Sequence, residues 1–597
     1  MASVFEQRKS NKVTLDDTTP LSCLIETAQK KEDHVEYILR VQRGPLRDHS
    51  WQVTKRYSDF EKLDAQLRVT NIELPLPPKK VFGNFDRDFI AERQNGLQVY
   101  LNAITSVPVI ANSLIVKKFL DLNNYSSNFL EIALQHVSMI FRSEPNWDVI
   151  EPLPEIGWRI RKHYILVKPV SQPKVRQMLS WTEYGPDMYL AVKDLSGIIK
   201  VLPTIKHPYI FPTHFTTANE NGSMIIRDFL EGGTLRDVIC KCKSKGTYLK
   251  KYSNPKAVTS LDFGTVKIFG RQILEALKFL QDKGFPYGHL HAGNVVVVNN
   301  TCQLLELENS VMGLPGYYRA FYIQLKKVQT LEMVDVYTFG QCLYEMAMGC
   351  QLTTPTCDTF PVECPAQIRS VLESILTTEA CKNGLPSVTD LLSHPLFSDV
   401  SLPPQVSKPV LKIPSKLKEF VKSSKEEIES RLKSDQKLLK QVQRISRAKE
   451  FHMSEEEKKK RRKSRKKAQE NGGTDSVTSS TPSVSSPPPT PTTPGPSSPP
   501  QLAPTPPSVV PPPPPPPPTG APPPPPPPPA GAPPPPAASG GPRSALLSSI
   551  TSFSKNGLKK AETNDKSKPK PLCEPICKKK KKKKKQREAI YVLPTTS

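Results

Sequence analysis

The pattern of apolar and polar positions is clearest near the start of the chain. Residues 35–41 alternate between apolar and polar side chains, which predicts a half-buried β-strand, and a second strand is expected from Trp51. An amphipathic helix should follow, with apolar residues three or four positions apart. These residues are Phe60, Leu63 and Leu67. A proline-rich segment, residues 74–80, comes next, and helical spacing resumes at Phe89. Residues 15–125 are therefore predicted to form a small sheet with helices.

The last third of the chain has a different pattern. Between residues 408 and 470, apolar residues recur at helical spacing among many charged ones, which predicts a basic segment of one or two solvent-exposed helices. These apolar residues are Leu417, Phe420, Ile428, Leu432, Leu438, Leu439, Val442 and Ile445. Residues 471–542 are rich in Ser, Thr and Pro and include the octaproline runs 511–518 and 522–529. That composition cannot bury a core, so it predicts a disordered linker with polyproline-II character.

Charge is distributed unevenly along the sequence. The chain has 597 residues and a formal net charge of +26, but most of the positive surplus lies in residues 408–470 and 543–597. The first 407 residues are nearly neutral. Basic tails are typical of contact with an acidic membrane or nucleic acid, or of a solvated arm. The eleven cysteines show no C-x-x-C spacing, which favours a reducing compartment such as the cytoplasm. No run of 18 apolar residues is present, so any membrane contact should be peripheral.

The motif Lys55-Arg-Tyr-Ser-Asp-Phe60 carries a resemblance to the PX (Phox-homology) family of phosphoinositide-binding domains, over roughly residues 15–125. The resemblance implies that Arg56 holds a 3-phosphate and that Tyr57 stacks under the inositol ring. It also implies that Lys79 meets the 1-phosphate and that Arg93 binds ring hydroxyls or a further phosphate. Arginine can bind phosphate oxygens in bidentate fashion and lysine acts as a point charge, so these residue types suit the chemistry. The alternative is that both arginines are ordinary surface residues.

Five segments in order between residues 150 and 400 resemble the protein-kinase family. They are Tyr189–Lys193, which would be the strand ending in the ATP-gripping lysine, then Lys206–Ile210, Ile225–Leu235, Val334–Met346 and Pro386–Phe397. The resemblance implies a two-lobed fold in which Asp335 anchors the catalytic-loop backbone. The chain as a whole is therefore expected to be a multidomain α+β protein with a disordered, basic C-terminal tail.

The loop Tyr287–Asn294 raises doubt about catalysis. It keeps Asn294, a metal-binding position of the kinase family, but His289 stands where the family has its catalytic Asp. A neutral imidazole can accept a proton, yet it adds no negative charge to organise the site. A metal pair of His289 and His291 is a remote alternative, because no third ligand is close in sequence.

Three further departures point the same way. No glycine-rich loop occurs from Tyr164 to Met188, and no Glu lies between Lys193 and His207 to pair with the lysine. The metal motif reads Glu306-Leu-Glu308, without its glycine. Together these losses predict a pseudokinase without a cofactor. Residual ATP binding through Lys193, Asn294 and Glu306 stays open, as does an active Ser/Thr kinase with an unconventional site.

Residues 543–561 resemble a WASP-homology-2 (WH2) motif, which binds monomeric actin. The resemblance implies that a short amphipathic helix enters a hydrophobic cleft of actin and that an extended Leu-Lys-Lys segment follows its surface. The residues concerned are Leu546, Leu547, Ile550, Leu558, Lys559 and Lys560. The polyproline tract before the motif suits profilin or Src-homology-3 domains. The polylysine tail, residues 562–597, suits anionic lipid, and Cys573 and Cys577 are conceivable acylation sites.

The order of these modules resembles that of the PX domain-containing kinase-like family. That resemblance implies the subunits of the Na,K-ATPase as partners. We therefore expect an adaptor in the cytoplasm and on the cytosolic face of endosomes or the plasma membrane. It would bind phosphoinositides, dock proteins through the kinase-like domain and bind actin through its tail. A nucleic-acid-binding role through the lysine tracts is the weaker alternative, because those tracts lack aromatic residues to stack on bases.

Overall fold

The computed structural model describes residues 15–79, 85–403 and 408–470. These residues form a small sheet with helices, a two-lobed domain and a long helix that ends at residue 470. No helix in these ranges is both long and apolar enough to cross a membrane. The mixed sheet-and-helix composition confirms the predicted α+β class.

The N-terminal part contains three antiparallel strands in the order β1-β2-β3. Its elements are β1 (Leu21–Lys30), β2 (Val35–Arg43), β3 (Ser50–Arg56), α2 (Tyr57–Leu67), η1 (Arg68–Thr70), α3 (Arg87–Ser106), α4 (Pro108–Ala111), α5 (Leu114–Leu120) and α6 (Leu122–Tyr125). The predicted alternation in β2 is confirmed, because Tyr37, Leu39 and Val41 are buried. The apolar face predicted for α2 is buried as well. Strand and helix thus share one core.

The first lobe of the larger domain is a five-stranded antiparallel sheet in the order β4-β5-β6-β8-β7. Its elements are α7 (Phe129–Ser143), β4 (Trp147–Leu153), β5 (Lys162–Pro169), β6 (Gln177–Glu183), α8 (Val192–Ile199), η2 (Leu202–Thr204), β7 (Phe215–Ala218) and β8 (Gly222–Asp228). The eight-residue helix α8 and the short 3-10 helix η2 separate the third strand from the fourth along the chain. This arrangement confirms the kinase-like fold expected of the domain.

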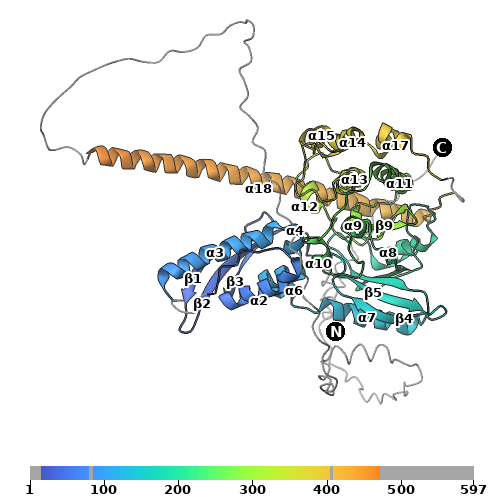
Figure 1. Ribbon diagram of the computed structural model, residues 1–597, viewed down its shortest axis with the longest axis horizontal. Coiled ribbons are helices and arrows are strands. Elements are labelled where there is room, and N and C mark those ends of the chain that lie inside the picture. Colours follow the sequence, from blue (N-terminus) through green and yellow to red (C-terminus); the bar gives the residue numbers. More distant parts are fainter. Residues whose placement is uncertain (1–14, 80–84, 404–407, 471–597) are drawn as a thin grey trace, which may run out of the picture. The chain divides into compact units, whose positions relative to one another are not determined.

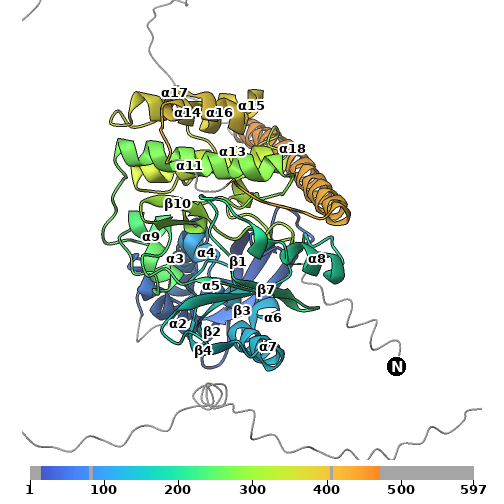
Figure 2. The same ribbon diagram turned by 90° about the vertical axis from the view of Figure 1, so that its right-hand side faces the viewer.

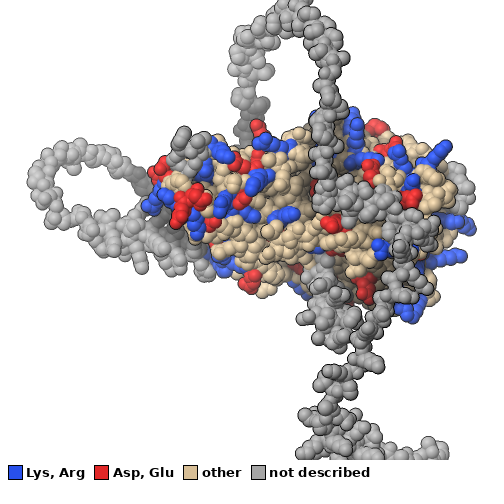
Figure 3. Space-filling view, turned by 90° about the horizontal axis from the view of Figure 1, so that it is seen from below, with Lys and Arg blue, Asp and Glu red and all other residues tan. Residues whose placement is uncertain are grey.

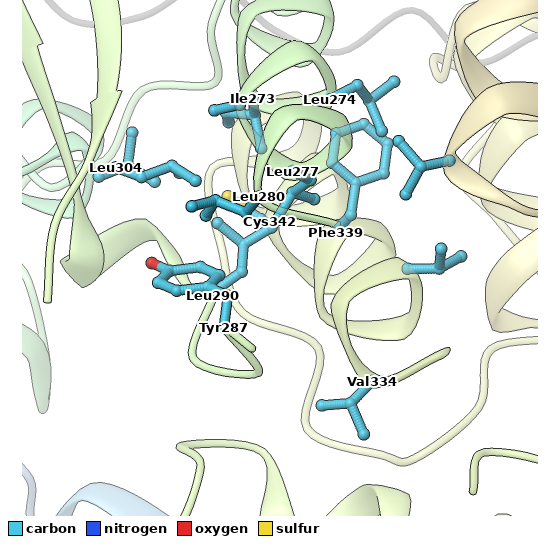
Figure 4. Close-up of a cluster of buried hydrophobic side chains, with 14 of the residues drawn as sticks. Ile273, Leu274, Leu277, Leu280, Tyr287, Leu290, Leu304, Val334, Phe339 and Cys342 are labelled. Atoms are coloured by element: carbon cyan, nitrogen blue, oxygen red, sulfur yellow. The ribbon is translucent and has the colours of Figure 1, made fainter. Parts of the chain in front are cut away.

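The second lobe is mainly helical and is built around α11 and α13 (Figures 1 and 2). Its elements are α9 (Leu235–Ile239), α10 (Tyr248–Tyr252), α11 (Phe263–Asp282), η3 (Ala292–Asn294), β9 (Val295–Val298), β10 (Thr301–Leu304), α12 (Arg319–Tyr322), α13 (Leu331–Met348), α14 (Ala366–Leu376), α15 (Thr378–Asn383), α16 (Val388–Ser393) and α17 (Pro395–Ser398). Figure 4 shows Tyr287 and Leu290 beside Leu277, Leu280 and Cys342 of the two central helices. The loop before η3 is therefore part of the hydrophobic core.

The structure corrects the placement of Lys193. The third strand of the sheet is β6, residues 177–183, whereas Lys193 lies in the first turn of helix α8 with its side chain exposed. The predicted strand ending at Lys193 is therefore wrong. The hairpin loop that corresponds to a glycine-rich loop is likewise residues 154–161, between β4 and β5, and its one glycine is Gly157.

Helix α18 (Ser415–Glu470) also differs from the prediction of solvent-exposed helices. Its first part packs on the two-lobed domain, where Val421 and Leu432 are buried and Leu417 lies against Gly197 of α8. The amide of Gln436 donates to three main-chain carbonyls of the second lobe, those of Tyr322, Leu325 and Val328, over 2.8–3.3 Å. Periodicity had revealed the apolar face of this helix but not the surface that covers it.

The surface of the described residues carries both signs of charge. On the face shown in Figure 3, Lys and Arg are interspersed with Asp and Glu among large uncharged areas. This mixture agrees with the near-neutral balance of the first 407 residues.

Gln436 offers a test of the α18 contact. Changing Gln436 to Ala leaves three buried carbonyls without this donor, so the free energy of unfolding should fall by about 1–3 kcal/mol. Urea unfolding of the full chain measures the change. Gln441→Ala, at an exposed position of the same helix, is the control and should change it by less than about 0.5 kcal/mol. Equal stability of the two variants would contradict the contact.

Candidate functional sites

A cleft between the two lobes is the first candidate site. It encloses about 150 Å³ and receives side chains from β5, β6 and β8 on one side and from the loops around η3 on the other. On β6 the residues that face it are Met178 and Ser180, so this strand supplies no cation. Lys193 is not among the residues that line the cleft. Asn294 and Glu306 are both lining residues, as predicted.

The cation that pairs with Glu306 beside this cleft is Lys162, at the start of strand β5. Its side chain is fully buried, and its Nζ lies 3.1 Å from Glu306 Oε1, 3.1 Å from Glu308 Oε1 and 3.1 Å from Asn309 Oδ1. These three oxygens satisfy the three donors of an ammonium group. Arg227 of β8 binds the second oxygen of Glu308 at 2.5 Å. The two lobes of the kinase-like domain therefore meet through one buried network of charges.

Glu306 is held entirely by the protein. Besides Lys162, it accepts hydrogen bonds from the Tyr164 hydroxyl at 2.7 Å and from the Asn309 amide at 2.8 Å. Burial alone would raise the pKa of Glu306, but the Lys162 charge and these hydrogen bonds hold it well below its usual value. The carboxylate that would coordinate a metal ion in a kinase is thus ionised and already paired.

His289 is buried and neutral. Burial, with the nearby guanidinium of Arg159, holds the pKa of His289 well below 6.5. Nη2 of Arg159 lies 3.3 Å from His289 Nδ1 and donates to the carbonyl of Pro315 at 2.8 Å. An imidazole that receives a hydrogen bond from a guanidinium at Nδ1 has little basicity left at that atom. The geometry therefore does not favour proton abstraction by His289.

The other loop residues support the backbone. The carboxyl of Asp335 accepts a hydrogen bond from the Gly288 N–H at 2.7 Å, which confirms the predicted anchoring of the loop. Burial raises the pKa of Asp335 to about 8. The Asn294 amide donates to the His289 carbonyl at 2.9 Å, inside the same loop. In this structure Asn294 therefore acts as a hydrogen-bonder of the fold.

The second candidate site lies in the N-terminal part, around Arg93 of helix α3. The Arg93 side chain is buried, and its guanidinium carbon lies 4.3 Å from the ring centroid of Tyr57 and 4.2 Å from that of Phe89. Stacking of this kind contributes about 0.5–2 kcal/mol and fixes the plane of the guanidinium. Two of its nitrogens, Nε and Nη2, have no hydrogen-bond partner. Arg93 is therefore not an ordinary surface arginine.

Of the remaining predicted lipid residues, Tyr57 contacts Arg93 directly, and Arg56 and Lys79 lie in the same N-terminal part. Arg56 is exposed at the start of helix α2, where its N–H donates to Asp59. The Tyr57 hydroxyl donates to the Pro77 carbonyl at 2.6 Å, so it ties the proline-rich segment to α2. The ammonium of Lys79 lies 3.1 Å from Glu61, with both side chains partly exposed. An exposed ion pair of this kind is weak and can exchange for a phosphate.

The predicted actin-binding residues, Leu546, Leu547, Ile550, Leu558, Lys559 and Lys560, lie outside the described residues. The polyproline runs, Cys573 and Cys577 do so as well.

Comparisons with known proteins support this division into parts. The PX domain family matches residues 46–123, and the WH2 motif matches residues 539–568. A "PX domain-containing protein kinase-like protein" of Mus musculus is 54% identical over 444 residues, which are 74% of this chain and 76% of that protein. This coverage spans more than any single domain of the chain. The chain belongs to the family of PX domain-containing protein kinase-like proteins.

Two more distant relatives match a smaller share of this chain. The "Slowpoke-binding protein" of Drosophila melanogaster is 32% identical over 277 residues, 43% of this chain and 53% of that protein. The "Probable inactive serine/threonine-protein kinase slob1" of Dictyostelium discoideum is 27% identical over 318 residues, 48% of this chain and 54% of that protein. Kinase-like relatives that are named inactive agree with the reading of a pseudokinase.

Sequence reasoning missed Lys162, Arg159 and Arg227. Each stands within or beside an apolar strand, where a charged side chain needs a buried partner. Lys162 lies two residues before the run Tyr164–Val167, and this position was the available signal. Its partners are more than a hundred residues away in the chain, so no local pattern could have named them.

Lys162 and Lys193 provide a matched pair for a test. Replacing Lys162 with Met leaves two buried carboxylates with less positive charge, so the free energy of unfolding at pH 7 should fall by roughly 3–5 kcal/mol. Lys193→Met removes an exposed lysine and should change it by less than about 0.5 kcal/mol. Urea unfolding of both variants decides whether Lys162 or Lys193 is the structural lysine.

The pH dependence adds a second readout of the same pair. In the wild type the pKa values of Glu306 and Glu308 are lowered, so their contribution is present at pH 7 and is lost as pH falls below 4.5. In Lys162→Met these pKa values should rise instead. The stability deficit of this variant should therefore shrink between pH 7 and pH 4. A deficit that stays constant would contradict the proposed ion network.

Proposed function

We propose that this protein is a peripheral-membrane adaptor that binds a 3-phosphorylated phosphoinositide through its PX domain. Its kinase-like domain serves as a docking surface for other proteins and does not transfer phosphate. Its WH2 motif binds actin. The adaptor acts in the cytoplasm and on the cytosolic face of endosomes or the plasma membrane.

The observation that carries lipid binding is the buried guanidinium of Arg93. A buried arginine with two unpartnered nitrogens is costly unless a ligand supplies acceptors. Stacking between Tyr57 and Phe89 holds the plane of this group before any ligand arrives, so little side-chain entropy is lost on binding. An inositol headgroup offers the required hydroxyl and phosphate oxygens, and Arg56 and Lys79 supply further positive charge.

The kinase-like domain is proposed to be inactive because its metal-binding carboxylate is already neutralised. Phosphoryl transfer depends on metal ions that bridge the nucleotide phosphates. Here Lys162 stands at Glu306, and His289 is neutral and hydrogen-bonded to Arg159. What remains is a folded surface that can bind proteins. Subunits of the Na,K-ATPase are one proposed partner, and the name of the Drosophila relative, "Slowpoke-binding protein", suggests a Slowpoke protein as another.

Lipid binding is tested with liposomes that contain phosphatidylinositol 3-phosphate. Arg93→Gln removes the stacked cation and should weaken binding of the full chain at least about tenfold, because a charge-assisted hydrogen bond to phosphate contributes about 1.5–3 kcal/mol. Arg56→Gln should act in the same direction. Arg68→Gln is the control, since Arg68 is exposed on the surface, where it lies 3.6 Å from Asp64 in an ion pair. Undiminished binding by Arg93→Gln would refute the site.

Actin binding is tested in the tail. Replacing both Leu546 and Leu547 with Ala removes the expected apolar contacts and should abolish most binding to monomeric actin, measured by fluorescence anisotropy of labelled actin. Replacing Lys583 and Lys584 in the polylysine run with Ala is the matched control and should leave that binding nearly unchanged. If the leucine variant binds as well as the control, the WH2 motif is not the actin site.

A further inference from the structure

The cleft between the lobes has room for a small ligand. Its volume of about 150 Å³ equals that of an engineered cavity that binds one benzene molecule. Aromatic side chains contribute to its walls, among them Trp158, Phe211 and Tyr248. A flat ring therefore fits this space.

Three residues that line this space from both lobes each have a buried side-chain donor without a hydrogen-bond partner. These donors are Ser180 Oγ on β6, Arg227 Nε on β8 and His291 Nε2 on the loop before η3. All three side chains are more than nine-tenths buried. The Nδ1 of His291 accepts a hydrogen bond from the Gly293 N–H at 3.0 Å, so the ring proton is on Nε2. A ligand that satisfies these atoms must therefore present acceptors.

One cation of the cleft, Arg159, has no ion-pair partner in the part of the chain that the structure describes. Lys162 and Arg227 are paired with Glu306 and Glu308, and Lys251 is paired with Asp237 at 2.9 Å. Arg159 also lines the cleft, but among the described residues no carboxylate lies within ion-pair distance of it. Its contacts are the neutral His289, the Pro315 carbonyl and the Trp158 ring, whose centroid lies 4.2 Å from the guanidinium carbon. A half-buried guanidinium that has no ion pair suits a ligand with one negative charge.

From these observations we propose that the cleft binds a one-ring organic anion, with one carboxylate or phosphate group, and no metal ion. Arg159 neutralises the anionic group, and Ser180, Arg227 and His291 donate hydrogen bonds to the ligand. Lys162 takes the place of a divalent cation at Glu306, so the anion binds directly to protein groups. This site is separate from the lipid site of the PX domain.

Thermal unfolding and calorimetric titration of the full chain in EDTA test the proposal. Phenyl phosphate and benzoate are the anionic probes, and they distinguish a phosphate from a carboxylate ligand. Benzyl alcohol is the uncharged control. At least one anion should raise the unfolding temperature, benzyl alcohol should raise it less, and added Mg²⁺ should change neither result.

Two variants locate the binding. Arg159→Gln should weaken the affinity for the anion about tenfold or more, and Arg176→Gln, at an exposed position of the same lobe, should leave it unchanged. Ser180→Ala removes one donor without a charge, so it gives a second measurement if Arg159→Gln unfolds the protein. It should weaken binding severalfold.

Three results would overturn the proposal. One is the failure of both anions to bind. Another is binding that Arg159→Gln and Ser180→Ala leave unchanged. The third is stabilisation by ATP with Mg²⁺ but not by either anion, which would return the cleft to a nucleotide site. Each of these outcomes is independent of liposome binding by the PX domain.

Discussion

The buried ammonium of Lys162 is the interaction on which the kinase-like domain depends. Strand β5 brings this cation from the first lobe to Glu306 and Glu308, which follow β10 in the second lobe. Removing any one member would leave a charge in a region without water, so the three must be kept together. In a kinase a nucleotide and metal ions bring such groups together. Here the side chain of Lys162 brings the two carboxylates together, so this contact between the lobes needs no ligand.

Backbone contacts reinforce this junction. Gly185, just after β6, donates its N–H to the Met312 carbonyl at 3.0 Å, and the Asp187 N–H donates to Gly313. The two glycine backbones approach so closely that a Cβ on Gly185 would lie 2.0 Å from the Gly313 oxygen. Arg319 of α12 and Arg431 of α18 both bind the Asp187 carboxylate. Helix α18 is thus a third component that secures the two lobes to each other.

The sequence predicted those features that depend on local pattern or on a contiguous motif. The strand at Tyr37–Val41, the buried face of α2 and the Asp335–Gly288 hydrogen bond are examples. It misplaced the kinase lysine because β6 carries Ser180 at a cleft-facing position, and the next lysine along the chain is Lys193. The ion network of Lys162 with Glu306 and Glu308 could not be predicted, because these residues are far apart in sequence and meet only when both lobes have folded.

The same network explains how a kinase-like fold can persist after its chemistry is lost. A cleft that depended on metal and nucleotide would lose part of its stability when they were absent. Lys162 supplies the positive charge permanently, Tyr164 donates to the same Glu306 oxygen, Oε1, and Asn309 donates to the other, Oε2. The fold is therefore free to keep its shape as a binding surface, while the PX domain and the WH2 motif provide the recognition of membrane and actin.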